Sequence, residues 1–162
     1  MKIKVCGMKH AENISDLISL PIDMMGLIFY PKSTRYVSQL DLSDFSTSHP
    51  SVKRVGVFVN ADLNEILEKV DQHHLDFVQL HGNESPALCE ELGKRISVIK
   101  AFSIAQEGDL KQTKEYEGSC NYFLFDTKTP QYGGSGQKFD WQILDAYQGE
   151  TPFLLSGGIS EN

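Results

Sequence analysis

Short apolar segments rich in Val, Ile and Phe alternate along this chain with segments in which apolar residues recur at helical spacing. Runs of about four to eight residues that are apolar at consecutive positions are typical of strands buried on both faces. Seven short segments rich in apolar residues resemble such strands, and they span residues 2–6, 24–30, 52–59, 76–80, 96–102, 121–125 and 151–156. The pattern therefore predicts seven β-strands.

Three of the intervening segments carry signals for a helix. Asp62 and Glu65 have the spacing of a capping box, and apolar residues follow at i, i+3, i+4 and i+7: Leu63, Ile66, Leu67 and Val70. A Ser-Pro pair and a terminal glycine predict a second helix over 85–93, and Asp140 opens a third that Gly149 stops. No linker or low-complexity tract interrupts the chain, so we expect one domain over residues 1–162.

Alternating buried strands and helices predict an α/β fold in which helices cover a parallel sheet. Two arrangements fit this order: an open doubly wound sheet and a closed TIM (β/α)8 barrel. Nearly every predicted strand ends in a chemically distinctive group, at Cys6-Gly7, Lys32-Ser33, Asn60, His81-Gly82, Ser103, Asp126 and Ser156-Gly157-Gly158. This favours the barrel, because a doubly wound sheet gathers its functional groups at one switch point.

The length of the chain bears on how much of a barrel it forms. A complete (β/α)8 barrel usually needs at least ~200 residues. We therefore expect these 162 residues to cover about strands 1–7 of a barrel domain that is incomplete at the C-terminus, lacking the last strand and helices.

Composition narrows the class of protein. The chain is 40% hydrophobic and 23% charged, as in ordinary globular proteins. Its net charge of -7 argues against a general nucleic-acid surface, which needs clustered Lys and Arg. No apolar run approaches the ~18 residues of a membrane span, and the first residues lack the apolar region of a secretory signal. We expect a cytoplasmic protein that binds neither nucleic acid nor membrane.

The cysteines and histidines predict neither disulfides nor a metal site. An odd number of cysteines without a CxxC pair indicates reduced thiols, at Cys6, Cys89 and Cys120. His73 and His74 are adjacent, so on a helix their side chains point about 100° apart and cannot share an ion. We expect both imidazoles at the surface of the helix.

Two residues at strand ends have the chemistry of proton transfer. Cys6 is either a small buried residue or a thiol that faces a pocket at the end of the first strand. To act as a base it needs a neighbouring cation, because a free thiol is only a few per cent ionised at neutral pH. Asp126 follows the apolar run YFLF, where a site carboxylate or a loop anchor is favoured over a core residue.

Four further side chains are candidates for a site at the same ends of the strands. Arg35 suits a carboxylate ligand, because a guanidinium group offers a planar bidentate fork, whereas Lys32 is expected to be solvated. His81, in QLHG, fits a structural and a pocket role equally well. Lys100 lies inside the fifth strand, where it is either catalytic or a side chain that snorkels or pairs with a carboxylate.

Two glycine-rich segments are candidates for binding phosphate. Gly157 and Gly158 follow the seventh strand, where backbone N–H groups can hold an anion at the start of a helix. The GGSG segment at 133–136 lacks Walker A spacing. We expect the loop from Lys128 to Gly136 to fold over Asp126 instead, with its glycines permitting movement.

Seven motifs in collinear order carry a family resemblance. They are KVCGM, GLIFYPKSTRYV, VGVFVN, VQLHG, VIKAF, LFDT followed by GGSGQKFDW, and LLSGGI. Together they closely resemble phosphoribosylanthranilate isomerase, an enzyme family of tryptophan biosynthesis, over essentially the whole chain. The resemblance implies a (β/α)8 barrel and an Amadori rearrangement that converts the aldose N-(5'-phosphoribosyl)anthranilate into the ketose 1-(2-carboxyphenylamino)-1-deoxyribulose 5-phosphate. It implies no cofactor and no metal.

The resemblance also implies roles for individual residues. Cys6 corresponds to the general base, Asp126 to the general acid, and Arg35 to the arginine at the anthranilate end of the substrate. Ring opening needs a proton on the furanose oxygen, and the resulting Schiff base must lose its C2' proton, which suits an acid and a base. The phosphorylated small-molecule substrate is anionic at both ends, so we expect further substrate contacts from His81, Gly157 and Gly158.

Two departures from the family pattern stand out. Thr34 replaces a residue that is commonly Pro, and the sequence stops at Asn162, whereas the family holds phosphate between the loops after strands seven and eight. We therefore expect part of a longer protein, or a chain that is inactive alone. Alternatives are another sugar-phosphate barrel enzyme and a non-catalytic receiver-type α/β module, which would need acidic residues where this chain has Cys6 and Asn60.

Overall fold

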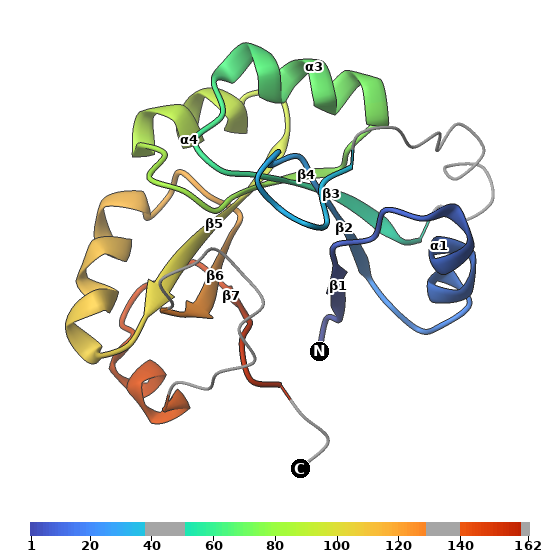
Figure 1. Ribbon diagram of the computed structural model, residues 1–162. Coiled ribbons are helices and arrows are strands. Elements are labelled where there is room, and N and C mark those ends of the chain that lie inside the picture. The colour runs from blue at the N-terminus through green and yellow to red at the C-terminus, as the bar shows by residue number, and fades with distance from the viewer. Residues whose placement is uncertain (38–50, 129–139, 160–162) are drawn as a thin grey trace. The chain divides into compact units, whose positions relative to one another are not determined.

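The computed structural model describes residues 1–37, 51–128 and 140–159, in which strands and helices alternate (Figure 1). The chain divides into two compact units, Met1–Asn83 and Glu84–Asn162. Within each unit, neighbouring strands pair in parallel. The predicted α/β organisation is therefore confirmed in both units, and the expectation of a single domain over 1–162 stays a prediction.

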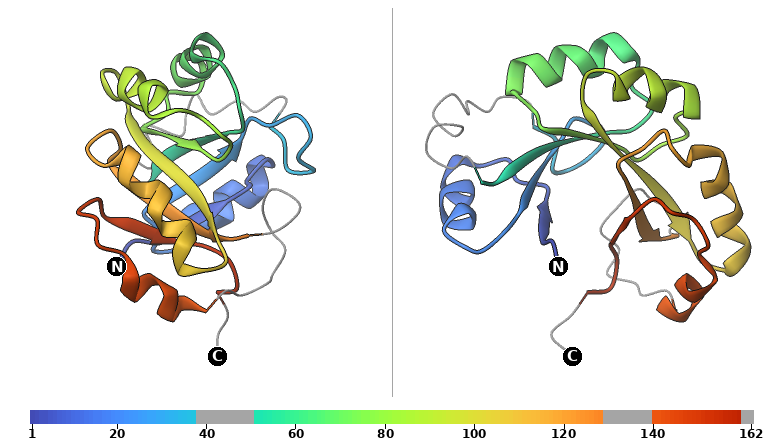
Figure 2. Two further views of the ribbon diagram at one scale, coloured as in Figure 1. Left: turned by 90° about the vertical axis from the view of Figure 1, so that its left-hand side faces the viewer. Right: turned by 180° about the vertical axis from the view of Figure 1, so that it is seen from behind.

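The first unit is a parallel sheet in the order β1, β2, β3, β4. Its strands are β1 (Lys4–Cys6), β2 (Met24–Ile28), β3 (Lys53–Phe58) and β4 (Phe77–Leu80), and its helices are α1 (Ala11–Ile18) and α3 (Leu63–His73). The predicted start of α3 is confirmed, because the Asp62 carboxylate accepts a hydrogen bond from the Glu65 backbone N–H at 2.9 Å. Helix α3 packs against β3, as the views in Figure 2 show.

The face of α3 that packs on the sheet explains one wrong prediction. His73 lies seven residues after the fully buried Ile66, so both side chains share the inward face of the helix. His73 is 7% exposed, and its ring centroid lies 4.9 Å from that of Phe29, which itself stacks on Phe58. Burial, followed by nearby positive charges, lowers the pKa of His73. The expectation that it lies at the helix surface was wrong.

The second unit is a parallel sheet in the order β5, β6, β7. Its strands are β5 (Ser97–Ile104), β6 (Tyr122–Thr127) and β7 (Phe153–Leu155). Its helices are α4 (Pro86–Gly93) and two 3-10 helices, η1 (Glu107–Tyr116) and η2 (Trp141–Ala146). The core of this unit is a cluster of aliphatic and aromatic side chains: Phe102, Ile104, Leu110, Phe123 and Phe125. Burial of each contributes roughly 1.5–3 kcal/mol.

The helix predictions in this unit are partly right. The range 85–93 is confirmed, with the Ser85 hydroxyl accepting a hydrogen bond from Leu88 N–H. The helix that begins after Asp140 ends at Ala146 rather than at Gly149. It ends there because Tyr147 adopts extended backbone angles, and the single proton of its hydroxyl is shared between the Glu117 carboxylate and the Thr151 carbonyl. Two helices, α1 and η1, were not predicted.

All seven predicted strands are present in the described residues, with boundaries that differ by a few positions. Strand β6 continues through Asp126 to Thr127, so Asp126 lies inside the strand rather than after it. Asp126 pairs with Ser103 of β5, and the carboxyl ends of these strands lie at one edge of the sheet. Within the described ranges, no helix is long and apolar enough to cross a membrane.

Candidate active site

Cys6 is the last residue of β1, and its thiol lies beside Gly26 of β2. The two residues are register partners in the sheet. A Cβ atom on Gly26 would lie 2.7 Å from the Cys6 Sγ and 3.0 Å from the Lys4 Nζ. The missing side chain at Gly26 therefore makes the space that the thiol occupies, and it leaves the Lys4 ammonium group next to the same point. Lys4 and Cys6 alternate on β1, so they project from one face of the strand.

Arg35 reaches the same place from the loop after β2. Its Nη1 donates a hydrogen bond to the Cys6 carbonyl oxygen at 3.2 Å. A Cβ atom on Gly7 would lie 2.6 Å from the Arg35 Cδ and 2.7 Å from Nη1, so the guanidinium lies directly against the Gly7 backbone. Gly7 has a φ of 93°, which a residue with a side chain rarely adopts.

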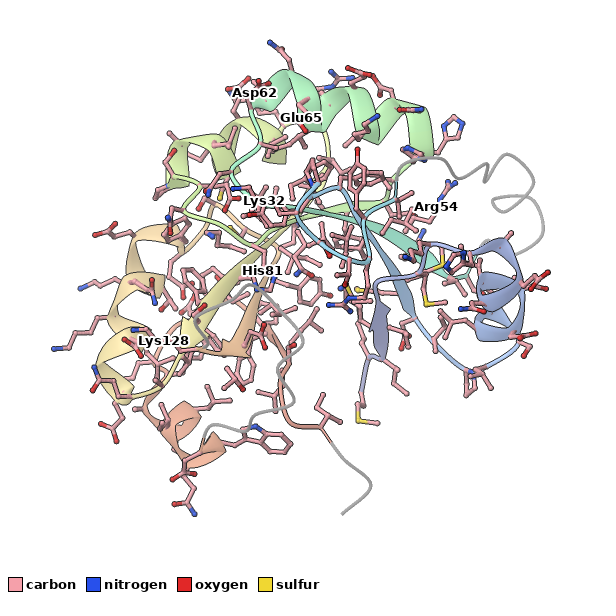
Figure 3. All side chains as sticks on the ribbon, in the orientation of Figure 1. Lys32, Arg54, Asp62, Glu65, His81 and Lys128 are labelled. Atoms are coloured by element: carbon pink, nitrogen blue, oxygen red, sulfur yellow. The ribbon has the colours of Figure 1, made fainter. Side chains whose placement is uncertain are left out.

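The loop that carries Arg35 is held by turns and by a lysine. Hydrogen bonds join Ser33 N–H to the Tyr30 carbonyl and Tyr36 N–H to the Ser33 carbonyl. The Lys9 ammonium donates to the Thr34 carbonyl at 2.9 Å. Thr34, which departs from the family pattern, thus holds the loop through its backbone carbonyl. The predicted proximity of Arg35 to the Cys6 strand end is found in the structure. Lys32, on the same loop, is exposed (Figure 3).

His81 lies immediately after β4, in the same unit as Cys6. Its backbone N–H donates to the Phe58 carbonyl at 2.9 Å, so the strand ladder fixes its main chain. The imidazole Nδ1 lies 2.9 Å from the Nε2 of Gln79, two residues earlier on the strand. His81 is half-buried, and Figure 3 labels it. Gln79 was not a candidate in the sequence analysis, although the two-residue spacing on a strand places both side chains on one face.

Asp126 and the glycine turn after β7 lie together in the second unit. Asp126 is 8% exposed, and its Oδ1 accepts a hydrogen bond from the Thr127 backbone N–H at 2.9 Å. A Cβ atom on Gly157 would lie 2.3 Å from the Thr127 Oγ1 and 3.1 Å from the Asp126 Oδ1. Only a residue without a side chain can bring this turn so close to the carboxylate.

The backbone of the turn also requires glycine. Gly157 and Gly158 have φ values of 85° and 65°, in the left-handed region. The turn is tied to the sheet by a hydrogen bond of 2.8 Å from Ser156 N–H to the Phe125 carbonyl. Successive backbone N–H groups in a turn can form a concavity that binds an anion.

Lys100 does not join the candidate site. Its ammonium pairs with the Glu84 carboxylate at 3.1 Å and donates to the Ala101 carbonyl at 3.2 Å. Both side chains of the pair are buried, with exposed fractions of 3% and 1%. The Tyr116 hydroxyl donates to the Glu84 carbonyl at 2.7 Å, which anchors the acidic partner. Of the two roles left open for Lys100, the structure therefore supports pairing with a carboxylate.

Several other expectations concern metals, thiols and the loop after β6. Across residues 1–37, 51–128 and 140–159, no three His, Cys, Asp or Glu side chains lie close enough to hold a metal ion. All three cysteines are free thiols. The Lys128 Nζ lies 3.6 Å from the Asp109 Oδ1, in an ion pair whose lysine side chain is exposed and whose aspartate is largely buried. The remainder of the expected cover over Asp126, including GGSG at 133–136, lies outside the described residues.

The second unit also contains a groove of about 1380 Å³ between η1 and the segment before β7. Glu117, Tyr147 and Pro152 are among its lining residues. Because Pro152 precedes β7, the groove lies toward the amino end of that strand, whereas Asp126 and Gly157 lie at the carboxyl ends. The groove is therefore separate from the candidate site residues of this unit.

Parallel strands joined by helices, with functional groups at the carboxyl ends of the strands in each unit, are typical of the (β/α)-barrel class of enzyme. Comparison with known proteins gives the family. A sequence model of the family N-(5'phosphoribosyl)anthranilate (PRA) isomerase matches residues 3–162. The N-(5'-phosphoribosyl)anthranilate isomerase of Parabacteroides distasonis is 52% identical over 162 residues, which are 98% of this chain and 73% of that protein. The chain belongs to the phosphoribosylanthranilate isomerase family.

Solved structures support the fold class. The crystal structure of phosphoribosyl anthranilate isomerase from Thermotoga maritima matches with a TM-score of 0.85 and 39% identity, over 98% of this chain and 78% of that one. A crystal structure of a phosphoribosyl anthranilate isomerase in complex with reduced 1-(o-carboxyphenylamino)-1-deoxyribulose 5-phosphate matches with a TM-score of 0.69 and 27% identity, over 100% of this chain and 90% of that one. The predicted (β/α)8-barrel fold class is confirmed, and the receiver-type alternative is excluded.

Proposed function

We propose that this protein catalyses the Amadori rearrangement of N-(5'-phosphoribosyl)anthranilate, with Cys6 as general base and Asp126 as general acid. The observation that carries this proposal is the family match over residues 3–162, within which Cys6 and Asp126 occupy carboxyl ends of strands. Both residues have the chemistry that the two proton transfers need.

In the first step the Asp126 carboxylic acid gives its proton to the furanose ring oxygen. The bond between C1' and the ring oxygen breaks, and the nitrogen lone pair forms a Schiff base with C1'. In the second step the Cys6 thiolate takes the proton from C2', and the electron pair moves to give an enolamine. Protonation at C1' and loss of the hydroxyl proton complete the ketose, so substrate and product are isomers.

The surroundings of Cys6 support its role as a base. A neighbouring cation favours the thiolate form of a cysteine. Lys4 places its ammonium group beside the space that the thiol occupies, and Arg35 donates to the Cys6 carbonyl. Two cations therefore lie near Cys6, and of the two only Arg35 was named from the sequence.

Substrate binding is proposed to divide among three groups of the chain. Arg35 provides a bidentate fork for the anthranilate carboxylate, which matches its fixed position against Gly7. Gly157 and Gly158 provide backbone N–H groups for the phosphate, because their left-handed backbone suits an anion-binding turn. His81 donates a hydrogen bond to a substrate oxygen. This arrangement binds a substrate that is anionic at both ends on a chain whose net charge is -7.

The proposal is tested by product analysis with the purified protein in D2O. The substrate should be consumed, as followed by its fluorescence, and the product should be a ketose with one solvent-derived deuterium at C1'. Mass spectrometry distinguishes this product from free anthranilate, which hydrolysis would release. Release of anthranilate without ketose, or recovery of unchanged substrate, would overturn the proposal.

A further inference from the structure

Gln79 is a polar residue that is buried inside a strand. It lies inside β4 with 2% of its surface exposed, and its register partner on β3 is the apolar Val57. Burial of an amide costs free energy unless its polar atoms are hydrogen-bonded. Within the described residues, the Gln79 Oε1 is buried without a hydrogen-bond partner, whereas its Nε2 lies 2.9 Å from the His81 Nδ1. In the part of the chain that the structure describes, the Gln79 side chain thus makes its hydrogen bond with His81.

The orientation of the Gln79 amide, with Nε2 toward the His81 ring, sets the direction of the hydrogen bond. The nitrogen of a glutamine amide carries two hydrogens and can only donate, so the His81 Nδ1 must accept. An imidazole nitrogen that accepts has no proton. The single proton of neutral His81 therefore resides on Nε2, and the hydrogen bond made by one ring nitrogen sets the state of the other.

We propose that Gln79 is a positioning residue that holds His81 in the tautomer protonated on Nε2. This inference rests on the function proposed above, and it adds what His81 does there. Through Nε2, His81 donates a hydrogen bond to an oxygen of the substrate. In this tautomer Nε2 cannot take up a proton, so His81 does not compete with Cys6 as a base.

The placement of both residues suits this task. Gln79 and His81 are two positions apart on one strand, so their side chains project from the same face. The Phe58 carbonyl holds the His81 backbone, and the Asn60 side chain accepts a hydrogen bond from Asn83 N–H at 2.7 Å. The segment that carries the imidazole is therefore anchored on both sides, and Gln79 fixes the rotation of the ring from beneath.

The direct test is nuclear magnetic resonance on the wild-type protein labelled with ¹⁵N, without substrate. Gln79 Nε2 and His81 Nδ1 should show a scalar coupling across the hydrogen bond, and the proton of the ring should be on Nε2. The His81→Asn variant assigns the ring signals among the five histidines. A proton found on Nδ1 of neutral His81 would overturn the inference, since Gln79 would then accept rather than donate.

Kinetics separate positioning from simple structural support. Gln79→Met keeps the length of the side chain and removes the donor, and it should raise KM about 3- to 10-fold with a smaller change in kcat. Gln79→Glu can only accept, so near pH 9, where imidazole is ordinarily neutral, the proton should move to Nδ1 and KM should rise further. Exposed Gln72, replaced by Met, is the control and should leave KM unchanged. Equal KM values in wild type and both Gln79 variants would contradict the proposal.

The two proposals fail in different ways. If the wild-type protein shows the coupling but does not form the ketose, the function proposed above is wrong and the tautomer assignment stands. If the protein forms the ketose but its neutral His81 carries the proton on Nδ1, the reaction stands and the role of Gln79 is wrong.

Discussion

The guanidinium of Arg35 donates a hydrogen bond of 3.2 Å to the carbonyl oxygen of Cys6, and it lies against the backbone of Gly7. The loop after β2 thus places the guanidinium group at the carboxyl end of β1, where this hydrogen bond and the Gly7 backbone hold it. This contact ties the residue proposed to bind the substrate carboxylate to the residue proposed to take the substrate proton. A change at Arg35 should therefore alter KM more than kcat.

Replacement of Arg35 by Ala should raise KM by about 10- to 100-fold, because a hydrogen bond to a charged group contributes roughly 1.5–3 kcal/mol. Arg35→Lys should recover only part of this loss, since an ammonium group lacks the bidentate fork. The control is Lys32→Ala on the same loop, where the side chain is exposed and KM should change less than about twofold. Similar KM values for Arg35→Ala and Lys32→Ala would show that Arg35 does not bind substrate.

Gly157→Ala should reduce kcat by about tenfold or more, because its Cβ would collide with Thr127 and displace the Asp126 carboxylate. The matched control is Gly118→Ala, whose φ of 80° is also left-handed but whose Cβ would meet nothing within 4 Å. Both changes should cost roughly 1–2 kcal/mol of stability from backbone strain. Steady-state kinetics and urea unfolding separate the two effects. A normal kcat in Gly157→Ala would contradict the close approach to Asp126.

Lys100→Met should lower the free energy of unfolding by roughly 3–5 kcal/mol, because it leaves the buried Glu84 carboxylate without its cation. Replacement of both members, as Lys100→Met with Glu84→Leu, should recover much of this loss. Lys94→Met, which breaks an exposed pair with Glu91, is the control and should leave the urea midpoint almost unchanged. Urea unfolding gives these values. A loss of activity in folded Lys100→Met as large as that in Asp126→Asn would instead favour a catalytic lysine.

Glu117 should make the stability of the protein depend on acid pH. Burial acts to raise the pKa of Glu117, but hydrogen bonds from the Thr151 side chain and backbone and from Tyr147 outweigh it, so its pKa lies below the ordinary 4.5. A carboxyl group with a lowered folded-state pKa stabilises the protein above its unfolded-state pKa, and the effect is lost as pH falls through the folded-state value.

The Glu117→Gln variant tests this dependence. At pH 7 it should lower the free energy of unfolding by roughly 1–3 kcal/mol, since neutral hydrogen bonds replace charge-assisted ones. The difference from wild type should shrink as the pH is lowered below about 4.5, the ordinary value for Glu. A constant difference from pH 7 to about pH 3 would contradict the lowered pKa.

Features set by residues close together in the sequence could be predicted, whereas features set by contacts between distant segments could not. Consecutive apolar residues such as those of β3 and β6 predict strands well, because burial on both faces leaves little room for polar positions. Local caps behave likewise: Asp62 and Ser85 bond to N–H groups three residues away. The prediction for His73 was wrong because the apolar stripe of α3 was followed only as far as Val70. The next inward position is His73, which packs on Phe29.

The candidate site needed information that no local pattern holds. Lys100 could not be assigned from its strand, because its partner Glu84 lies on another segment, before α4. Lys4 and Gln79 carry weak signals, since each lies two positions from a recognised candidate on the same strand. The spacing alone does not show contact, which here depends on the missing side chain of Gly26 and on the orientation of the Gln79 amide.

The most direct measurement of the central claim is kcat for the isomerisation by wild type, Cys6→Ser and Asp126→Asn, followed by loss of substrate fluorescence. Each variant should lose ~10² or more in kcat with a smaller change in KM, because each removes one proton transfer and leaves the substrate contacts in place. Circular dichroism and urea unfolding should show both variants folded. A kcat near that of wild type in folded Asp126→Asn, or in folded Cys6→Ser, would contradict the assignment of the acid or of the base.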